Sequence, residues 1–270
     1  MSRLVEINFD GLVGPSHNYA GLSLGNIAST SHKGDPSYPR AAALQGIEKM
    51  RGNLARFGAQ GFLLPLPRPN QGLIDALAID PVTDRALLAA AWSASSMWTA
   101  NAATVSPGPD CADGKCHLTP ANLVTMIHRA QEWPDTKRQL DIAFGNGDHF
   151  VVHDAVPPTF GDEGAANHMR LCASHSEAGV EVFVYGRPGG KFPARQHEQA
   201  SRAVARLHGL DPARAVFIEQ NPVAIEAGAF HNDVVAVANE DVVFAHELAF
   251  ADRHGAYAAM RKAFPALQVV

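Results

Sequence analysis

The chain has 270 residues, with 22 Lys and Arg against 27 Asp and Glu, so its formal net charge is −5, and 46% of its residues are hydrophobic. This apolar content excludes wholesale disorder, and the mildly acidic balance argues against nucleic acid as a partner. Three cysteines are too few for a secreted disulfide framework, and Glu6 comes too early for the apolar region of a signal peptide. The sequence has no run of 18 apolar residues that could form a transmembrane helix, so we expect a soluble, cytoplasmic protein.

Segments typical of strands and of helices alternate along the chain, which indicates an α/β or α+β fold. The predicted elements are, in order, a strand at 4–9, helices at 39–57 and 84–92, a helix from Thr119-Pro120 to residue 131, strands at 150–152 and 181–185, a helix at 196–207, a strand at 215–218, a short helix after Asn221-Pro222, a hairpin of 233–238 and 242–245, and a helix at 250–264. No linker divides the chain, and long polar loops at 14–39, 106–118 and 155–166 are candidates for function.

A glycine-rich segment, GLSLG at residues 21–25, matches the G-x-S-x-G pattern of a serine nucleophile. That chemistry needs a buried strand before the serine and a helix after it. The preceding GPSHNYA is not strand-like and the following NIASTS is a poor helix, which argues against a serine hydrolase. The alternatives are a surface loop or a glycine loop that offers backbone N–H groups to a ligand.

The cysteines and clustered histidines give weak signals for a metal. Cys111 and Cys116-His117 lack the C-x-x-C spacing and a second ligand pair, so a turn through Asp113-Gly114 explains the segment better. Cys172 is expected to pack in the interior. The segment HFVVH at 149–153 favours a strand with edge histidines. We therefore expect no metal and no other cofactor.

Two clusters of ionisable residues are suited to catalysis or binding. His231 and Asp233 lie where the chain enters the predicted hairpin, and a histidine beside a carboxylate suits proton transfer. Asp162 and Glu163 lie between glycines, where carboxylates can bind a cation or a guanidinium. Both clusters could instead cap turns, and the residues alone do not decide between the two roles.

Four further residues are candidates for ligand contacts. Arg195 in FPAR and the pair His128-Arg129 could bind a carboxylate, because a guanidinium grips a carboxylate bidentately. Exposure at the surface is the usual alternative for arginine. Asn101, among small and aromatic neighbours, is either a turn cap or a ligand contact.

Long matching stretches connect this sequence to a known family: NFDGLVGPSHNYAGLSLGN, SSMWTANAATVSP, DGKCHLTPANL, GDEGAANHMRL, FPARQ and AFHNDVVAVAN. They spread over essentially the whole chain, which closely resembles the N-succinylarginine dihydrolase family of bacterial arginine catabolism, within the pentein superfamily. The resemblance implies a pentein-type α/β propeller of ββαβ modules around a central site.

The resemblance also implies the chemistry. The family hydrolyses N2-succinyl-L-arginine to N2-succinyl-L-ornithine, ammonia and carbon dioxide through a Cys–His–Glu constellation, without a metal. Glu163 matches the catalytic acid and His231 the catalytic base. The residues that match the family's substrate contacts are Ala20, Gly21, Leu22, Ser23, Leu24, Gly25, Asn26, Ile27, Ala28, Ser29, Asn101, His128, Arg129, Arg195 and Asp233.

The nucleophile departs from the family pattern. The family's nucleophilic cysteine follows the histidine, after a glycine-rich stretch that this chain does not contain, whereas Cys111, Cys116 and Cys172 all precede His231. The resemblance therefore implies a single pentein-type catalytic domain over residues 1–270 that lacks the family's C-terminal modules and is inactive alone. The alternative is a non-catalytic binder of succinylarginine or a similar guanidino acid. A homodimer is compatible with the sequence.

Overall fold

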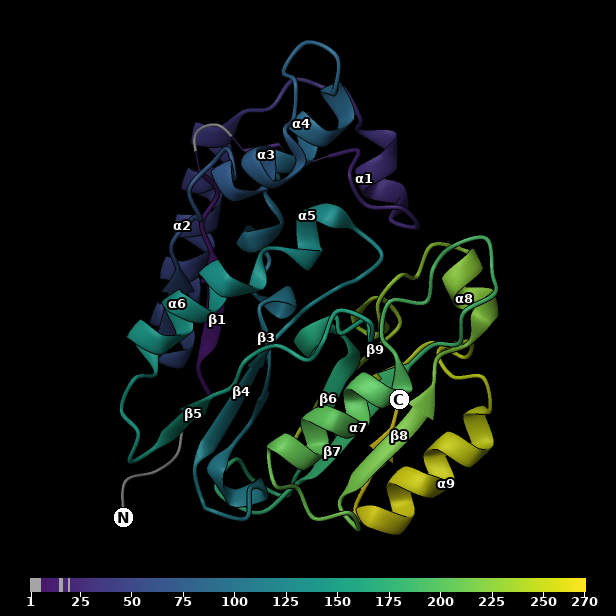
Figure 1. Ribbon diagram of the computed structural model, residues 1–270. Helices are drawn as coiled ribbons and strands as arrows, with labels where there is room; N and C mark the ends of the chain where they lie inside the picture. The colour runs from purple at the N-terminus through teal and green to yellow at the C-terminus, as the bar shows by residue number, and fades with distance from the viewer. Residues whose placement is uncertain (1–5, 15–16, 19) are drawn as a thin grey trace.

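A computed structural model describes residues 6–14, 17–18 and 20–270 of the protein. In this part of the chain the strands form four small sheets, and helices and loops cover their faces and ends (Figure 1). The strands are β1 (Asn8–Gly11), β2 (Gln60–Leu63), β3 (Ala103–Ser106), β4 (Cys116–Pro120), β5 (Phe150–Val152), β6 (His168–Leu171), β7 (Val180–Tyr185), β8 (Ala215–Glu219), β9 (Ala236–Asn239), β10 (Val242–Ala245) and β11 (Gln268–Val269).

The helices are mostly short. The α-helices are α1 (Ile27–Ser31), α2 (Pro39–Phe57), α3 (Gln71–Leu77), α4 (Arg85–Ala91), α5 (Ile127–Ala130), α6 (Trp133–Ala143), α7 (Glu198–Leu207), α8 (Pro222–Glu226) and α9 (Arg253–Ala263), and the 3₁₀ turns are η1 (Ser95–Met97), η2 (Thr99–Asn101), η3 (Gly108–Asp110), η4 (Gly164–Asn167) and η5 (Asn232–Val234). No helix among the described residues is long and apolar enough to cross a membrane.

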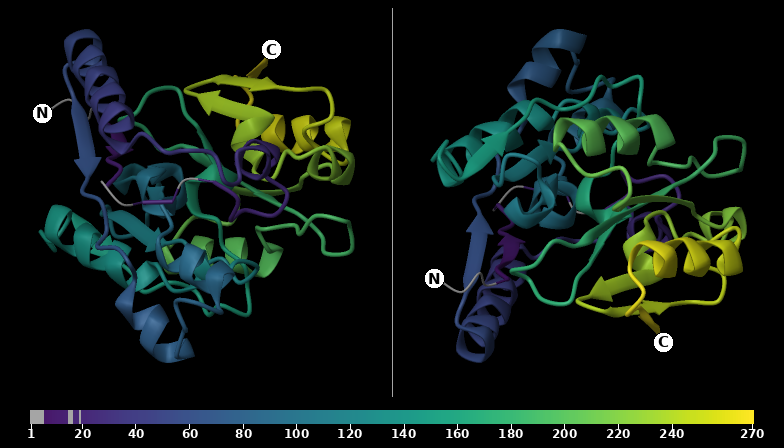
Figure 2. Two further views of the ribbon diagram at one scale, coloured as in Figure 1. Left: turned by 90° about the horizontal axis from the view of Figure 1, so that it is seen from above. Right: turned by 90° about the horizontal axis from the view of Figure 1, so that it is seen from below.

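Three of the sheets repeat one ββαβ unit. In each, two antiparallel strands are followed by a helical crossover and a third strand that lies parallel to the second: β3-β4-β5, β6-β7-β8 and β9-β10-β11. A crossover is required because parallel strands cannot be joined by a tight turn. The remaining sheet pairs β1 with β2 in parallel across α2. Figure 2 shows the β9-β10-β11 unit and α2 at opposite sides of the molecule.

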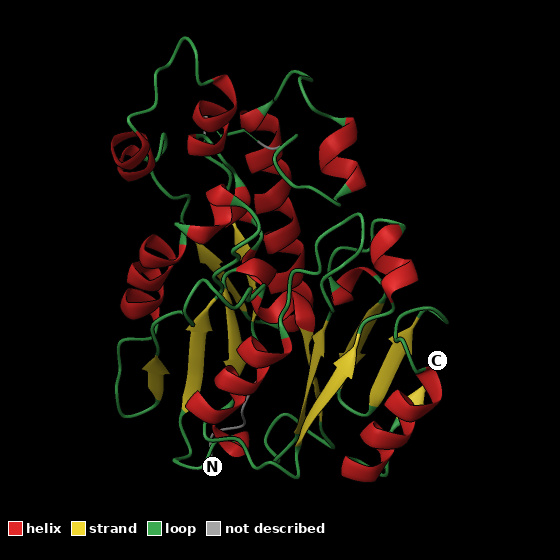
Figure 3. Ribbon diagram, turned by 45° about the vertical axis from the view of Figure 1, so that its right-hand side comes forward, coloured by secondary structure: helices red, strands yellow, loops and turns green. Residues whose placement is uncertain are grey.

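The core is built around β7, which is buried on both faces. Val180, Val182 and Val184 pack with β9, β10 and α9, whereas Phe183 packs with α7 on the other side. Alternating side chains point to opposite faces of a strand, so this division follows directly from the sequence VEVFVY. Figure 3 shows the strands of these units gathered in one half of the molecule and the short helices over the other half.

One predicted element is wrong. Thr119-Pro120 was expected to begin a helix, but both residues end the strand β4, and the next helix, α5, begins at Ile127. The Thr119 hydroxyl lies 2.8 Å from His208 Nε2 and caps no helix. Pro120 can end a central strand because the pairing of β4 with β5 stops at Leu118. In the strand predicted at 4–9, residues 4 and 5 lie outside the described part, and β1 begins at Asn8.

Candidate functional site

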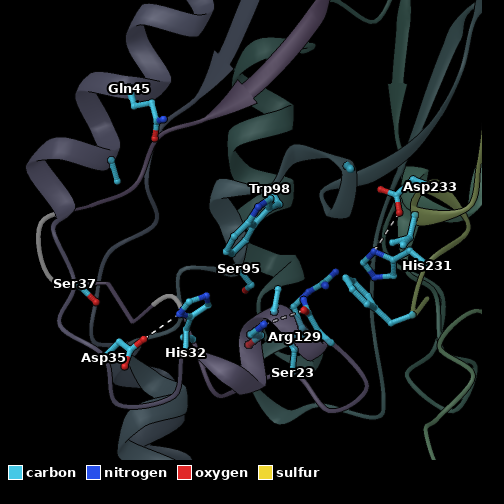
Figure 4. Close-up of a pocket in the computed structure, with 18 of the residues that line it drawn as sticks. Ser23, His32, Asp35, Ser37, Gln45, Ser95, Trp98, Arg129, His231 and Asp233 are labelled. Atoms are coloured by element: carbon cyan, nitrogen blue, oxygen red, sulfur yellow. Dashed lines mark hydrogen bonds and ion pairs between the residues drawn. The ribbon is translucent and has the colours of Figure 1, made fainter. Parts of the chain in front are cut away.

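A cavity of about 1060 Å³ lies where the connections between the repeated units meet (Figure 4). Its walls come from segments far apart in the chain: the loop and helix ends between residues 20 and 45, the turns before β3, α5, the connection before α7, and the turn before β9. Of the residues predicted as contacts, those that line it are Ala20, Ser23, Asn26, Ala28, Ser29, Arg129, Arg195 and Asp233, together with His231.

The repeated unit explains why Glu163 and His231 meet. Glu163 lies five residues before His168, the first residue of β6, and His231 lies five residues before Ala236, the first residue of β9. Each therefore occupies the same place in its own unit, beside the 3₁₀ turn that leads into the first strand, and η4 packs against η5. The fold brings the two residues together although 67 other residues separate them in the sequence.

Glu163 is the electrostatic centre of the site. Its side chain is fully buried, and its Oε1 lies 2.6 Å from Arg129 Nη1, 2.6 Å from His231 Nε2 and 3.8 Å from Arg195 Nη1. Burial by itself raises the pKa of a carboxyl, but Arg129, His231 and Arg195 more than offset it, so the pKa of Glu163 is held well below its usual range. Glu163 is consequently a carboxylate.

His231 is held as the partner of this carboxylate. Burial lowers the pKa of an imidazole, but Glu163 at Nε2 and Asp233, 3.6 Å from Nδ1, outweigh burial and Arg195, so the pKa of His231 is raised. Phe230 packs edge-on against the imidazole at 4.3 Å between ring centroids. A histidine with a raised pKa at a cavity wall can donate a proton to a leaving group and, once neutral, accept one from water.

Arg195 ties the glycine-rich loop to this centre. Its Nη2 donates to the Leu24 carbonyl at 2.8 Å, and its guanidinium lies 4.6 Å from the centroid of the Phe230 ring. Burial lowers the pKa of Arg195 to about 10, which leaves it a cation at neutral pH. The buried Nε of Arg195 and Oε2 of Glu163 have no hydrogen-bond partner among the described residues. An unpaired buried donor and an unpaired buried acceptor are suited to a polar ligand.

Hydrogen bonds to Gln196 and Asp162 fix the backbone around Glu163. Gln196 Oε1 accepts from the Glu163 backbone N–H at 2.7 Å, and its Nε2 donates to Asp162 Oδ1 at 3.0 Å. Asp162 Oδ1 also accepts from the Gly164 N–H at 3.3 Å. Gly164 has φ +76°, and a Cβ there would lie 3.2 Å from the Ala121 Cβ, so the turn requires glycine. Adjacent residues of FPARQ thus hold the side chain and the backbone of Glu163.

Comparison with known proteins decides the family, because the family described as succinylarginine dihydrolase matches residues 3–270. The chain belongs to the succinylarginine dihydrolase family. It is 68% identical to an N-succinylarginine dihydrolase of Novosphingobium aromaticivorans and 64% identical to one of Sphingopyxis alaskensis, over 99% of this chain in both cases. It spans 65% and 64% of the length of these two relatives.

Solved structures confirm the pentein-type α/β fold expected for this family. The chain is similar to the substrate-bound N-terminal domain of ArgZ, a cyanobacterial arginine dihydrolase, with a TM-score of 0.58, 14% identity, and coverage of 98% of this chain and 75% of that one. It is also similar to SxtG, an amidinotransferase from Microseira wollei, with a TM-score of 0.55, 11% identity, and coverage of 98% and 74%.

Glu163 is fully buried and does not line the described cavity wall, whereas Arg129 and His231, which contact it, do. The other residues predicted from the family are placed as follows. Gly21, Leu22, Leu24, Gly25 and Ile27 do not line it but form the loop that does, which closes where Gly21 N–H donates to the Ser29 carbonyl at 2.8 Å and where Asn26 caps α1. His128 is buried behind Arg129, and burial lowers its pKa to about 3. Asn101 ends η2, and its side chain lies outside the described part of the structure.

The glycine-rich segment does not have the geometry of a serine nucleophile. Ser23 lines the cavity, but the residues described before it form no strand, and the helix after it has five residues. Ser95, Trp98 and Phe230 also line the cavity and were missed in the sequence analysis. The segment SSMW, within a stretch that matches the family, was the available signal for the first two.

The cysteines lie away from the cavity. Cys111, Cys116 and Cys172 are free thiols, none of them lines the described cavity wall, and burial raises the pKa of all three, to about 12 for Cys111 and about 11 for Cys116. Gly114 turns the chain between the first two with φ +74°. No group of three or more His, Cys, Asp or Glu among the described residues is arranged to hold a metal ion.

Proposed function

We propose that this chain binds N2-succinyl-L-arginine in the cavity and carries the acid and the base of its hydrolysis to N2-succinyl-L-ornithine. The observation that carries the proposal is the 2.6 Å contact between the fully buried Glu163 and His231, which lines the cavity together with Arg129, Arg195 and Asp233. The N-succinylarginine dihydrolases at 68% and 64% identity support the same substrate.

The charges of the site match those of the substrate, which has one guanidinium and two carboxylates. Asp233 lines the cavity and supplies one carboxylate for the guanidinium, and Glu163, buried beside His231 with an unpaired Oε2 among the described residues, would supply the second. Arg195 retains an unpaired Nε for a carboxylate or amide oxygen of the succinyl group. Arg129 and Arg195 both face Glu163, so their first role is to keep it ionised.

In the family route a thiolate attacks the guanidinium carbon and a C–N bond breaks as ammonia leaves. Loss of ammonia leaves an amidino group bonded to the cysteine sulfur. His231, protonated through its contact with Glu163, would donate the proton to the departing ammonia. It would then accept a proton from the water that attacks the amidino carbon and breaks the C–S bond. The ureido product passes through the same cycle. Two waters are consumed, and two ammonia molecules and one carbon dioxide are released.

The thiolate is the step that this chain does not support by itself. Its three thiols are held away from the cavity with raised pKa values, so none is poised to attack a ligand beside Glu163. We therefore propose that the 270-residue chain binds substrate without turnover. The same observation favours the second candidate, a non-catalytic binder of succinylarginine or a related guanidino acid.

Two assays on the purified chain separate these outcomes. Calorimetry with N-succinylarginine is expected to show saturable one-to-one binding, and an ammonia assay in the same buffer is expected to show no sustained release. Absence of binding would refute the proposed ligand. Sustained ammonia release that survives alkylation of all three thiols would refute the proposed need for a thiolate.

A further inference from the structure

The position of Glu163 and His231 within the repeated unit has a third counterpart. Trp98 lies five residues before Ala103, the first residue of β3, as Glu163 lies five before His168 and His231 five before Ala236. Like the other two, Trp98 immediately precedes a 3₁₀ turn, η2, that leads into the first strand of its unit. The first of the three complete units therefore places an aromatic side chain where the next two place the acid and the base.

The three turns pack against one another in series. η2 packs against η4, and η4 packs against η5. Around Gly164 the approach is close, because a Cβ on that residue would lie 3.5 Å from the carbonyl oxygen of Ala100 in η2. The side chains that precede these turns are thus directed to one region by the fold itself.

Trp98 presents its indole to the cavity. Together with Ser95 and Arg129 it lines the wall, and Figure 4 shows it on a different wall from His231 and Asp233. It is 47% exposed, although the turn that follows it is anchored by a hydrogen bond from the Thr99 hydroxyl to the Phe9 carbonyl. Phe230, which also lines the cavity and packs against His231, already has Arg195 over its ring. Ligand pockets are lined largely by hydrophobic and aromatic side chains, so an exposed indole on an anchored turn is suited to stack on a ligand.

We propose that Trp98 is a specificity-determining residue that stacks on the alkyl-guanidinium part of the ligand, opposite Glu163 and His231. A guanidinium is planar and weakly hydrated, so it stacks well on an aromatic face while its edge N–H groups remain free for carboxylates. Trp98 would cover the face of the group whose edge Glu163 binds. This assignment rests on the proposed function for the choice of an arginine derivative.

Intrinsic fluorescence tests the contact directly, because the chain has three tryptophans, Trp92, Trp98 and Trp133. N-succinylarginine is expected to change the emission of the wild-type chain and of Trp92→Phe, whose substituted residue does not line the described cavity wall, but not that of Trp98→Phe. Calorimetry is expected to show that Trp98→Leu binds about 2- to 30-fold more weakly, the range typical of cation–π contacts, and that Trp98→Phe loses less.

The charge of the ligand separates stacking on the guanidinium from simple packing. Trp98→Leu is expected to weaken N-succinylarginine more than its neutral isostere N-succinylcitrulline. An equal loss for both ligands, or the same ligand-induced emission change in Trp98→Phe as in the wild-type chain, would overturn the proposal. If Trp98→Leu does not fold, the emission of the wild-type chain and Trp98→Phe still decides.

Failure of the proposed function gives a different pattern. If the wild-type chain does not bind N-succinylarginine, the proposed ligand is wrong, and the Trp98 contact is then tested with L-arginine and agmatine as probes. Quenching of the Trp98 emission by these guanidinium compounds, with none by ornithine, would support the contact. Absence of any difference between the two classes would overturn it.

Discussion

Replacing Glu163 by Gln perturbs the charge on which the site depends while it preserves the shape of the side chain. Glu163 is fully buried, and one of its oxygens lies 2.6 Å from both Arg129 and His231. Removing one partner of a buried ion pair costs about 3–5 kcal/mol, because the opposite charge stays buried without compensation. His231 can release its proton when the carboxylate is gone, so we expect a loss of about 3 kcal/mol in the free energy of unfolding at neutral pH.

The pH dependence of this loss follows from the two pKa shifts. The raised pKa of His231 gives stability that is fully present below the unfolded value of 6.5 and is lost as the pH rises through the folded pKa. The lowered pKa of Glu163 gives stability that is present above 4.5 and is lost in stronger acid. The difference between wild type and Glu163→Gln should therefore be largest between about pH 5 and 6.5 and shrink toward alkaline pH.

Urea unfolding at several pH values, followed by circular dichroism, measures this difference. The matched control is Glu48→Gln, which breaks the exposed Glu48–Arg51 pair and should leave the unfolding free energy almost unchanged. If Glu163→Gln is as stable as the control at pH 6, or if its stability follows pH as that of the wild-type chain does, the electrostatic description of the site is refuted.

Three further predictions concern groups outside this pair. Burial raises the pKa of Asp162 from 3.8 to about 6, so the free energy of unfolding falls as the pH rises from about 4 to 6. In urea titrations Asp162→Asn should therefore stabilise the chain by up to about 3 kcal/mol at pH 7.5 and by nothing at pH 4. A variant that is destabilised at pH 7.5 would contradict this. Burial and neighbouring imidazoles lower the pKa of His208 to about 2, so its contribution to stability is present above pH 6.5 and is lost below it. The free energy of unfolding of His208→Gln should therefore fall less steeply below pH 6.5 than that of the wild-type chain. An unchanged slope would contradict a buried, neutral His208. The raised pKa values of Cys111, Cys116 and Cys172 should make all three thiols react slowly with iodoacetamide at pH 7.5, as measured by mass spectrometry. N-succinylarginine should not change these rates. Rapid alkylation of one thiol that the ligand blocks would place a nucleophile in the cavity.

Local sequence patterns predicted several elements correctly. The strands at Phe150–Val152 and Val180–Tyr185, the helix Glu198–Leu207 and the short helix capped by Asn221 are confirmed to within two residues of their predicted starts. The two strands are short apolar runs, the helix Glu198–Leu207 buries residues 200, 201, 204 and 205 on one face, and Asn221 caps the short helix, so the local sequence suffices to define each element.

Elements that depend on distant partners were not predictable in the same way. β6 reads HMRL, and its polar residues are tolerated because His168 bonds to the buried Glu181 and Arg170 forms a bidentate pair with Asp110. Thr119-Pro120 carried a helix-start signal, and strand pairing in β4 overrode it. Tertiary contacts of this kind outweigh local propensity.

The candidate site shows the same division. The family motifs predicted Glu163 and His231, and the structure brings them into contact. The same motifs predicted Arg129 and Arg195 as contacts for substrate carboxylates, and only the fold shows that both guanidinium groups face Glu163. The equivalent positions of Trp98, Glu163 and His231 became visible only once the strand boundaries of the three units were known.

Calorimetric titration of the 270-residue chain with N-succinylarginine is the most direct measurement of the central claim, that this cavity holds a succinylated arginine against Glu163 and His231. The account predicts saturable one-to-one binding that weakens at least tenfold in Glu163→Gln and is much weaker for N-succinylornithine, which lacks the guanidinium. Absence of saturable binding at millimolar ligand, or equal affinity for the two ligands, would contradict it.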